Sequence, residues 1–385
     1  MRRFTFLLLM ILAFAAVAHA QIGKRVTIQA GTPEDRAVRE ITRATDPAEK
    51  LKLLDAFLAE HAQDDLALVA YDLYIEHYFQ AQNYAKVYEY GEKALAVDPD
   101  AYGSLNRMFT AAQQQGDRAR LMKYGLQIGE VVQRFKVRPA PEGTQEDVWQ
   151  ANKKMALEDN QETINYVAYT LFSTAQQNQD LAARAAELEA FVGAFPDSPY
   201  TTNARTAVAG TYQQMQQYDK MDAFVEKVLA DEPKNVTLLL MLADSWAERG
   251  VKLDNAEKYA GRALEALEAA QKPESLDDAQ WAAQKSMQQG LAHSTVGQVQ
   301  LHRQRYAQGV EALTKAAPLL KSETLLYARN QLRLGYAYAS LRQSDQARKA
   351  LTEAAEADTP YRARAQEIMK NLPPAGPPAK RRPRP

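Results

Sequence analysis

Hydrophobic and small residues recur at helical spacing along most of the chain. The clearest stretch is residues 330–360, NQLRLGYAYASLRQSDQARKALTEAAEADTP, which predicts two amphipathic helices joined by a tight turn. Its small side chains, among them Gly335, Ala347 and Ala354, fall where two antiparallel helices would press together. Earlier segments repeat this pattern with losses. The pattern therefore predicts an all-α chain built from helical hairpins.

These spacings resemble the tetratricopeptide repeat family over roughly residues 34–372, most strongly in the second, fifth, sixth and eighth units. The resemblance implies a right-handed superhelical α-solenoid in which each antiparallel hairpin packs only on its neighbours. The positions that carry it are small residues, aromatic residues and turn prolines: Tyr78, Ala94, Pro99, Pro196, Tyr218, Pro233, Ala243, Trp246, Ala256, Ala263, Gly297, Ala316, Gly335, Tyr338, Ala347 and Ala354.

The same period gives the expected organisation of the chain, with one insertion. Pro139, Pro141 and Gly143 break the period, and Thr144 with Asp147 resembles a capping pair that starts a helix. This insertion is either a functional projection or a lid over the hydrophobic edge. The expected segments are a signal peptide (1–20), an N-terminal extension (21–33), units one to three (34–135), the insertion of a loop plus a helix (136–160), units four to six (161–270), a linker and lead-in helix (271–288), units seven and eight (289–360), a capping helix (361–372) and a disordered, proline-rich basic tail (373–385).

The first twenty residues have the pattern of a secretory signal. Two arginines precede an apolar run from Phe4 to Val17, and Ala18-His19-Ala20 follows, so we expect cleavage after Ala20. The apolar run is shorter than the roughly 20 residues of a membrane helix, which disfavours an uncleaved anchor. The chain has no cysteine, which excludes disulfides, thiolate metal sites and lipid attachment. We therefore expect an exported protein, periplasmic in a Gram-negative bacterium or secreted, and not a lipoprotein.

The charge is nearly balanced, at a formal net −1. Four positive charges gather in the tail, at Lys380, Arg381, Arg382 and Arg384. No basic stripe runs along a predicted helix face, so we expect no nucleic-acid partner. The tail is either a solvated end or a weak contact with anionic envelope surfaces.

Residues for catalysis are not found in recognisable patterns. The sequence lacks GxSxG, GxxxxGK[ST] and HExxH motifs. His293 and His302 are nine residues apart, about 900° around a helix, and so face opposite sides. We therefore predict no catalytic residues, no metal site, no cofactor and no enzyme activity.

A group of tyrosines in the second unit could form a sugar-binding platform. Aromatic residues at spacings of three and four are more often core, because a tyrosine can bury its ring while its hydroxyl finds a partner. The core interpretation is favoured for this group, which comprises Tyr71, Tyr74, Tyr78, Tyr84, Tyr88 and Tyr90.

The resemblance also implies a binding surface, because in this family the first helix of each hairpin lines a concave groove. Arg329 and Arg333 stand at two positions of the clamp that some members use to hold the C-terminal carboxylate of chaperones. Leu240, Asp244 and Thr295 stand where other clamp residues belong, and Asp244 would repel a carboxylate. The candidate groove residues are Tyr166, Tyr169, Ser173, Gln176, Asn203, Thr206, Gln213, Ser294, Gln298, His302, Arg329, Arg333 and Tyr336.

These residues are mostly amides, hydroxyls and tyrosines, which suits an extended peptide or a helix. The sequence therefore favours a non-catalytic scaffold or adaptor of the bacterial cell envelope with protein partners. Two alternatives stay open: a soluble carrier of polysaccharide or cell-wall fragments, and an accessory subunit of an envelope enzyme complex.

Overall fold

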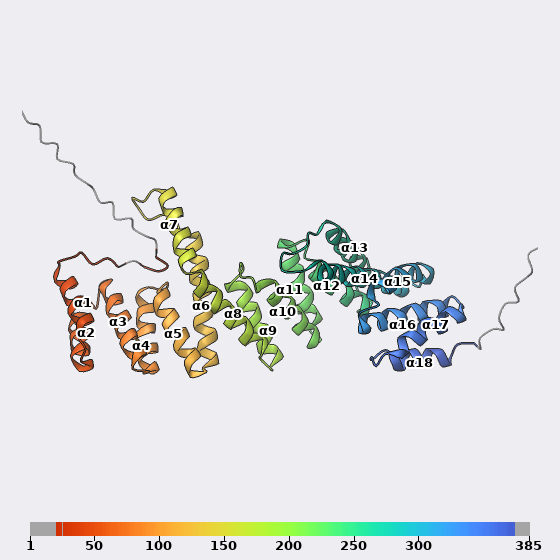
Figure 1. Ribbon diagram of the computed structural model, residues 1–385, viewed down its shortest axis with the longest axis horizontal. Coiled ribbons are helices and arrows are strands. Elements are labelled where there is room, and N and C mark those ends of the chain that lie inside the picture. Colours follow the sequence, from red (N-terminus) through yellow and green to blue (C-terminus); the bar gives the residue numbers. More distant parts are fainter. Residues whose placement is uncertain (1–20, 25, 374–385) are drawn as a thin grey trace, which may run out of the picture. The chain divides into compact units, whose positions relative to one another are not determined.

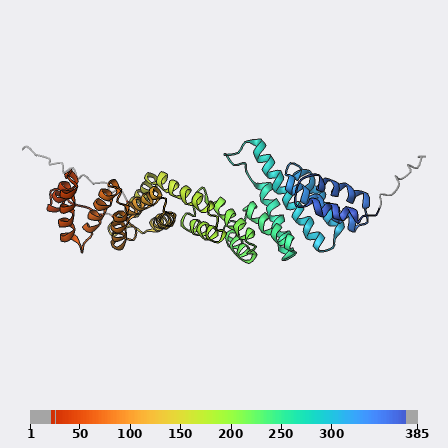
Figure 2. The same ribbon diagram turned by 90° about the horizontal axis from the view of Figure 1, so that it is seen from below.

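The computed structural model describes residues 21–24 and 26–373, which form eighteen α-helices and no strand. Figure 1 shows these helices as successive antiparallel pairs within each part of the chain, and Figure 2 gives the same succession from below. The predicted signal peptide and residues 374–385 of the predicted tail lie outside the described residues. Within the described part, none of the helices combines the length and the apolar character that crossing a bilayer requires.

The chain divides into two compact units, with the boundary between Thr211 and Tyr212 inside the tenth helix. The first unit holds α1 (Pro33–Arg43), α2 (Pro47–His61), α3 (Leu66–Gln80), α4 (Tyr84–Val97), α5 (Tyr102–Gln115), α6 (Arg118–Val137), α7 (Glu146–Asp159), α8 (Gln161–Gln176), α9 (Leu181–Ala194) and most of α10 (Thr201–Gln214). The second unit holds α11 (Tyr218–Asp231), α12 (Val236–Arg249), α13 (Leu253–Ala269), α14 (Asp278–His302), α15 (Tyr306–Leu320), α16 (Thr324–Ser340), α17 (Ser344–Glu356) and α18 (Arg362–Lys370).

Side-chain caps begin several of these helices. The Asp46 carboxylate accepts a hydrogen bond from the Glu49 amide at 2.8 Å, and Pro47 occupies the first turn of α2. Asp277 and Gln280 form a reciprocal capping box at the start of α14. Each of these caps satisfies an amide group that a helix start leaves without an intrahelical partner.

The small residues of the repeat lie where the two helices of a hairpin meet. A Cβ added to Gly297 would lie 2.5 Å from Leu313, and one added to Gly335 would lie 2.5 Å from Leu351. Both glycines therefore allow a close approach that no larger residue permits. The predicted alanine positions are all fully buried: Ala94, Ala243, Ala256, Ala263, Ala316, Ala347 and Ala354.

The larger predicted repeat residues lie at the edges of the same seams. Trp246 is fully buried, and its indole Nε1 donates to Asp222 at 2.6 Å. The tyrosines at repeat positions are half-buried, whereas the prolines are exposed in the turns between hairpins; they are Tyr78, Tyr218, Tyr338, Pro99, Pro196 and Pro233.

The turn inside the hairpins recurs with the same backbone geometry. A residue one or two positions past the end of the first helix adopts a left-handed conformation, with φ near +60°, at Gln82, Gly116, Gln216, Gly250, Gln304 and Arg342. The following amide then bonds back to the carbonyl five residues earlier, which is a Schellman-type helix end. Gln82 and Gly116 are 34 residues apart, and so are Gln216 and Gly250. This spacing is the length of a tetratricopeptide repeat.

The insertion forms α7, which packs against the C-terminal end of α6. Trp149 Nε1 donates to the Arg138 carbonyl at 3.0 Å, and Lys153 Nζ donates to the Lys136 carbonyl at 2.9 Å. The α7 side chains therefore satisfy carbonyl groups that a helix end leaves without partners. The predicted capping by Thr144 is wrong by one residue, because Gln145 stands at the N-cap without a side-chain hydrogen bond.

The lead-in helix and the first helix of unit seven form one helix, α14, of 25 residues. It runs without a break through residue 288, where the sequence suggested a boundary. The early part of α14 packs on α15, because Ser286 Oγ donates to the Leu319 carbonyl and Gly290 lies against Leu320. Those contacts favour continuing the helix over starting a new one.

The tyrosines of α3 and α4 pack on one another, as the core interpretation predicts. Tyr74 is 1% exposed, and its ring stacks on that of Tyr90 with centroids 4.2 Å apart. Tyr78 stacks on Tyr90 at 5.6 Å. The faces of these three rings pack against each other, so the three rings do not form an exposed aromatic platform.

The left-handed turns give a direct test of the repeat geometry. Gly116→Ala should lower the free energy of unfolding by about 1 kcal/mol, because φ is +66° there and a Cβ is strained in that region. Gly210 in α10 is the matched control, since it also has open space around it but no positive φ. Gly210→Ala should stabilise by about 0.5–1 kcal/mol through helix propensity. Chemical denaturation of both variants checks this, and equal signs would contradict the turn assignment.

Candidate functional site

In the first unit, the predicted groove residues form an uncharged surface. Tyr166 and Tyr169 on α8 are about half exposed. The Tyr166 hydroxyl accepts a hydrogen bond from Gln113 Nε2 at 2.5 Å, and the Tyr169 ring lies 5.5 Å from that of Tyr200. The other predicted residues of this unit are exposed or half-buried and belong to α8 and α10: Ser173, Gln176, Asn203 and Thr206. Gln213 is exposed in the part of α10 that belongs to the second unit.

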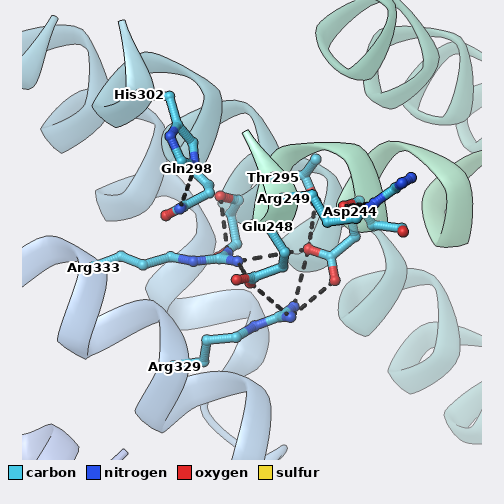
Figure 3. Close-up of polar contacts among 10 residues, drawn as sticks. Asp244, Glu248, Arg249, Thr295, Gln298, His302, Arg329 and Arg333 are labelled. Carbon is cyan, nitrogen blue, oxygen red and sulfur yellow. Dashed lines mark hydrogen bonds and ion pairs between the residues drawn. The ribbon is translucent and has the colours of Figure 1, made fainter. Parts of the chain in front are cut away.

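In the second unit, the first helices of three consecutive hairpins bring charged residues together (Figure 3). On α12, Asp244 and Glu248 are four residues apart and so share one helix face. On α16, Arg329 and Arg333 have the same spacing. We call the following set the ionic cluster: Asp244, Glu248, Ser294, Thr295, Arg329 and Arg333.

Asp244 is the centre of the ionic cluster. Its carboxylate accepts two hydrogen bonds from Arg329, with Nη1 to Oδ2 at 2.8 Å and Nη2 to Oδ1 at 3.2 Å. Thr295 Oγ1 donates to Asp244 Oδ1 at 3.1 Å. This fork-shaped pairing is the strongest arrangement that an arginine and a carboxylate can make.

Arg333 is the most deeply buried charge of the cluster, with 6% exposure. Its Nη1 donates to Ser294 Oγ at 2.8 Å, and its Nη2 donates to Glu248. Burial, and after it the charge of Arg329, lowers the pKa of Arg333 from the usual arginine value. The carboxylates of Asp244 and Glu248 oppose this effect. Two cations and two anions therefore balance within the ionic cluster.

The structure corrects two expectations for this region. Ser294 and Arg333 are buried, although the sequence placed them on the exposed groove surface. Arg329 and Arg333, which stand at clamp positions for a carboxylate, both form ion pairs with Asp244 and so are not free cations. The reason is lateral spacing, since α12 and α16 are close enough for Asp244 to reach Arg329 across α14.

A pocket of about 280 Å³ lies beside the ionic cluster and brings four predicted groove residues together. Tyr336 is 44% exposed, and Gln298 Nε2 lies 3.1 Å from His302 Nε2. We call this the α16 pocket; its lining residues are Gln298, Leu301, His302, Leu332, Arg333, Tyr336, Arg364 and Ile368. The lining combines apolar side chains with two arginines and one histidine, and it includes no acidic residue.

Four lining residues and Glu248 were not predicted as site residues. Leu301, Leu332, Arg364 and Ile368 come from three helices, and α18 was expected only to cap the fold. Glu248 carried a usable signal, because its spacing from Asp244 matches that of the two arginines. Such matched spacing on neighbouring first helices predicts ion pairs across an array.

The chemistry of this arrangement is recognition. The α16 pocket offers an apolar floor for a side chain, hydrogen-bonding groups at Gln298 and Tyr336, and positive charge for a carboxylate. Within residues 21–24 and 26–373, no three side chains among histidine, aspartate and glutamate stand close enough to share a metal ion.

Removing the centre of the ionic cluster should destabilise the second unit. In Asp244→Ala the two buried arginines lose their shared carboxylate, and we expect a loss of about 3 kcal/mol in unfolding free energy. Glu311→Ala is the control, because the Glu311–Lys315 pair on α15 is highly exposed and should leave stability almost unchanged. Denaturant unfolding followed by tryptophan fluorescence measures both, and similar losses would contradict the assigned weight of Asp244.

No family model matches this chain, and no curated protein matches it. Solved structures that it resembles include yeast Tom70, with 11% identity over 91% of this chain and 66% of that chain, and a TM-score of 0.40. A human IFIT1 dimer with m7Gppp-AAAA has 14% identity over 84% of this chain and 67% of that chain, with a TM-score of 0.34. A Pyrococcus horikoshii STAND protein with a tetratricopeptide repeat sensor has 13% identity over 88% and 48%, with a TM-score of 0.36.

The chain thus spans just under two thirds of the length of Tom70. The fold assignment rests on the chain's own helices, on its left-handed turns and on their 34-residue spacing. Together these features confirm the predicted all-α, tetratricopeptide-like array of helical hairpins.

Proposed function

We propose that this chain is a non-catalytic scaffold that binds a peptide segment of another protein in the α16 pocket. The main support for this proposal is that one pocket brings together four residues that the sequence predicted as groove residues. They are Gln298, His302, Arg333 and Tyr336. Apolar side chains from α14, α16 and α18 complete this pocket. An apolar floor beside positive charge suits a segment that carries one apolar side chain and one carboxylate.

This binding takes place in the bacterial cell envelope. The support is the sequence alone: the predicted signal peptide and the expected cleavage after Ala20. The partner is then a periplasmic or secreted protein, and the basic tail adds a weak contact with anionic envelope surfaces. An accessory role in an envelope enzyme complex is a special case of the same binding.

A carrier of polysaccharide is less well supported. That alternative used the tyrosines of the second hairpin, and three of them stack on each other within the α3/α4 hairpin. A sugar ring would need an exposed aromatic face. The observations therefore favour a protein partner over a glycan.

Site-specific cross-linking in cells tests this function. A photo-reactive amino acid in place of Tyr336 should capture an envelope protein, identified by mass spectrometry. Lys349 is the matched control position, because it is exposed on α17, the other helix of the same hairpin. Capture at Tyr336 and not at Lys349 supports the α16 pocket, whereas equal capture at both positions, or glycan capture without protein, contradicts it.

Truncating the apolar floor should weaken capture of the same protein. Ile368→Ala removes apolar contact area from the pocket, and we expect a loss in affinity of about tenfold, or roughly 1.4 kcal/mol. Leu325→Ala is the control, since Leu325 is exposed and is not among the lining residues. Calorimetry with the captured protein measures both variants; equal losses would show that the pocket has no special part.

Glu248 should act as a built-in competitor for the partner's carboxylate. Its side chain is 44% exposed and bonds to both arginines, so a ligand carboxylate must compete with it for Arg333. Glu248→Gln should raise affinity for an acidic segment about tenfold and make binding more salt-sensitive. Glu311→Gln should leave affinity unchanged. Titration at two salt concentrations checks this, and weaker binding by Glu248→Gln would exclude a carboxylate ligand at Arg333.

A further inference from the structure

The short segment formed by residues 21–24 packs against the first turns of α3 and α5. Ile22 is only 3% exposed, although it precedes the first helix in the sequence and belongs to no helix itself. A pocket of about 150 Å³ lies beside the segment, lined among others by Gln21, Asp72, Tyr102 and Ser104. The segment is therefore a docked part of the first unit.

Specific bonds hold this segment in place. The Lys24 amide donates to Asp98 Oδ2 at 2.7 Å, and Lys24 Nζ pairs with Asp65 at 2.6 Å. Arg138 Nη1 donates to the Gly23 carbonyl at 3.3 Å. These bonds tie the segment to α3, to the turn before α5 and to the residue that follows α6.

Gly23 is required by the backbone at this position. Its φ is +102°, and an added Cβ would lie 2.6 Å from the Asp100 carbonyl oxygen. A residue with a side chain would meet both conformational strain and a backbone clash. The docked path therefore depends on glycine.

The pocket contains one exposed carboxylate, that of Asp72, and one buried hydroxyl, that of Tyr102. Ser104 Oγ donates to Asp72 at 2.9 Å and is its one hydrogen-bond donor within the described residues. Burial raises the pKa of the Asp72 carboxyl, against that hydrogen bond. The Tyr102 hydroxyl is buried and has no hydrogen-bond partner in the described part of the chain. A cation with several N–H donors would satisfy both groups.

Three neighbouring side-chain cations that the structure describes are paired with other acids. Lys24 pairs with Asp65, while Arg134 and Arg138 both pair with Asp100. A further source of positive charge at this place is the backbone itself. Cleavage after Ala20 would turn the backbone nitrogen of Gln21, a residue that lines the pocket, into an α-ammonium group.

We propose that this pocket binds the chain's own processed N-terminus, with the α-ammonium group of Gln21 paired to Asp72 and donating to the Tyr102 hydroxyl. The inference rests on the proposed cleavage after Ala20 and not on any partner of the α16 pocket. The positive end of α5 opposes a cation here, but the Asp98 carboxylate in the preceding turn offsets that dipole. Signal cleavage then completes the packing of the first unit.

The reactivity of the α-amine tests this site directly. Two chains are compared: one that begins at Gln21, and one with Gly-Ser placed before Gln21, which moves the amine away. Mass spectrometry first verifies each N-terminus and shows that Gln21 has not cyclised. In the first chain, ion pairing should raise the pKa of the amine above its usual range of about 7.7–8.0. Acylation of this amine near neutral pH should be at least tenfold slower than in the extended chain.

Asp72→Asn is the key variant, because it keeps the size of the side chain and removes the charge. It should bring the amine of the chain that begins at Gln21 to the reactivity of the extended chain, and lower its melting temperature. In the extended chain the same variant should change the melting temperature much less. Asp147→Asn on α7 is the control and should change neither measurement.

Gly23→Ala gives an independent check, since it should detach the segment without altering Asp72. The amine should then react as fast as in the extended chain. Equal acylation rates in the two starting chains, or an Asp72→Asn effect that is the same in both, would overturn the proposal. Because no partner protein is used, failure here is separate from failure of the proposed scaffold function.

Discussion

The close approach of the two helices of a hairpin, seen in α14/α15 and α16/α17, is the constraint on which this part of the fold depends. Gly297 lies against Leu313 and Gly335 lies against Leu351, each at a distance that leaves no room for a Cβ. With the helices this close, the leucine is completely buried and the hairpin becomes a rigid building unit. Each such unit can bury its remaining apolar face only against the next one, which makes the array nearly one-dimensional.

In an array whose hairpins contact only their neighbours, few contacts join residues that are distant in the sequence. Side-chain contacts between hairpins therefore contribute more to stability. Asp222 on α11 accepts from Trp246 on α12 at 2.6 Å. Arg303, after α14, pairs with Asp254 and Glu257 on α13. The ionic cluster goes further, because it joins the first helices of three hairpins. Ties of this kind couple the unfolding of neighbouring repeats that would otherwise unfold with little cooperation.

The sequence was sufficient for the parts that local physics decides. Helical periodicity and the small seam residues were enough to predict the fold class. The burial of Ser294 and Arg333 could not be foreseen, because it depends on how closely α12, α14 and α16 lie side by side. The continuity of α14 also depends on tertiary contacts, since a polar lead-in becomes helical only when it packs on α15. The periodicity of a single sequence does not predict how closely neighbouring repeats pack side by side.

Stability alone does not account for the ionic cluster. Desolvating two arginines and two carboxylates is expensive, and well-packed apolar residues in the same place often stabilise more. The distribution of exposure within the cluster suggests another role: Asp244 and Arg333 are largely buried, whereas Glu248 remains 44% exposed at its edge. A fixed buried pair with one exchangeable carboxylate can discriminate between ligands by charge, because a neutral segment gains nothing by displacing Glu248. For the proposed peptide-binding scaffold, selectivity for charge therefore accounts for the two arginines better than stability does.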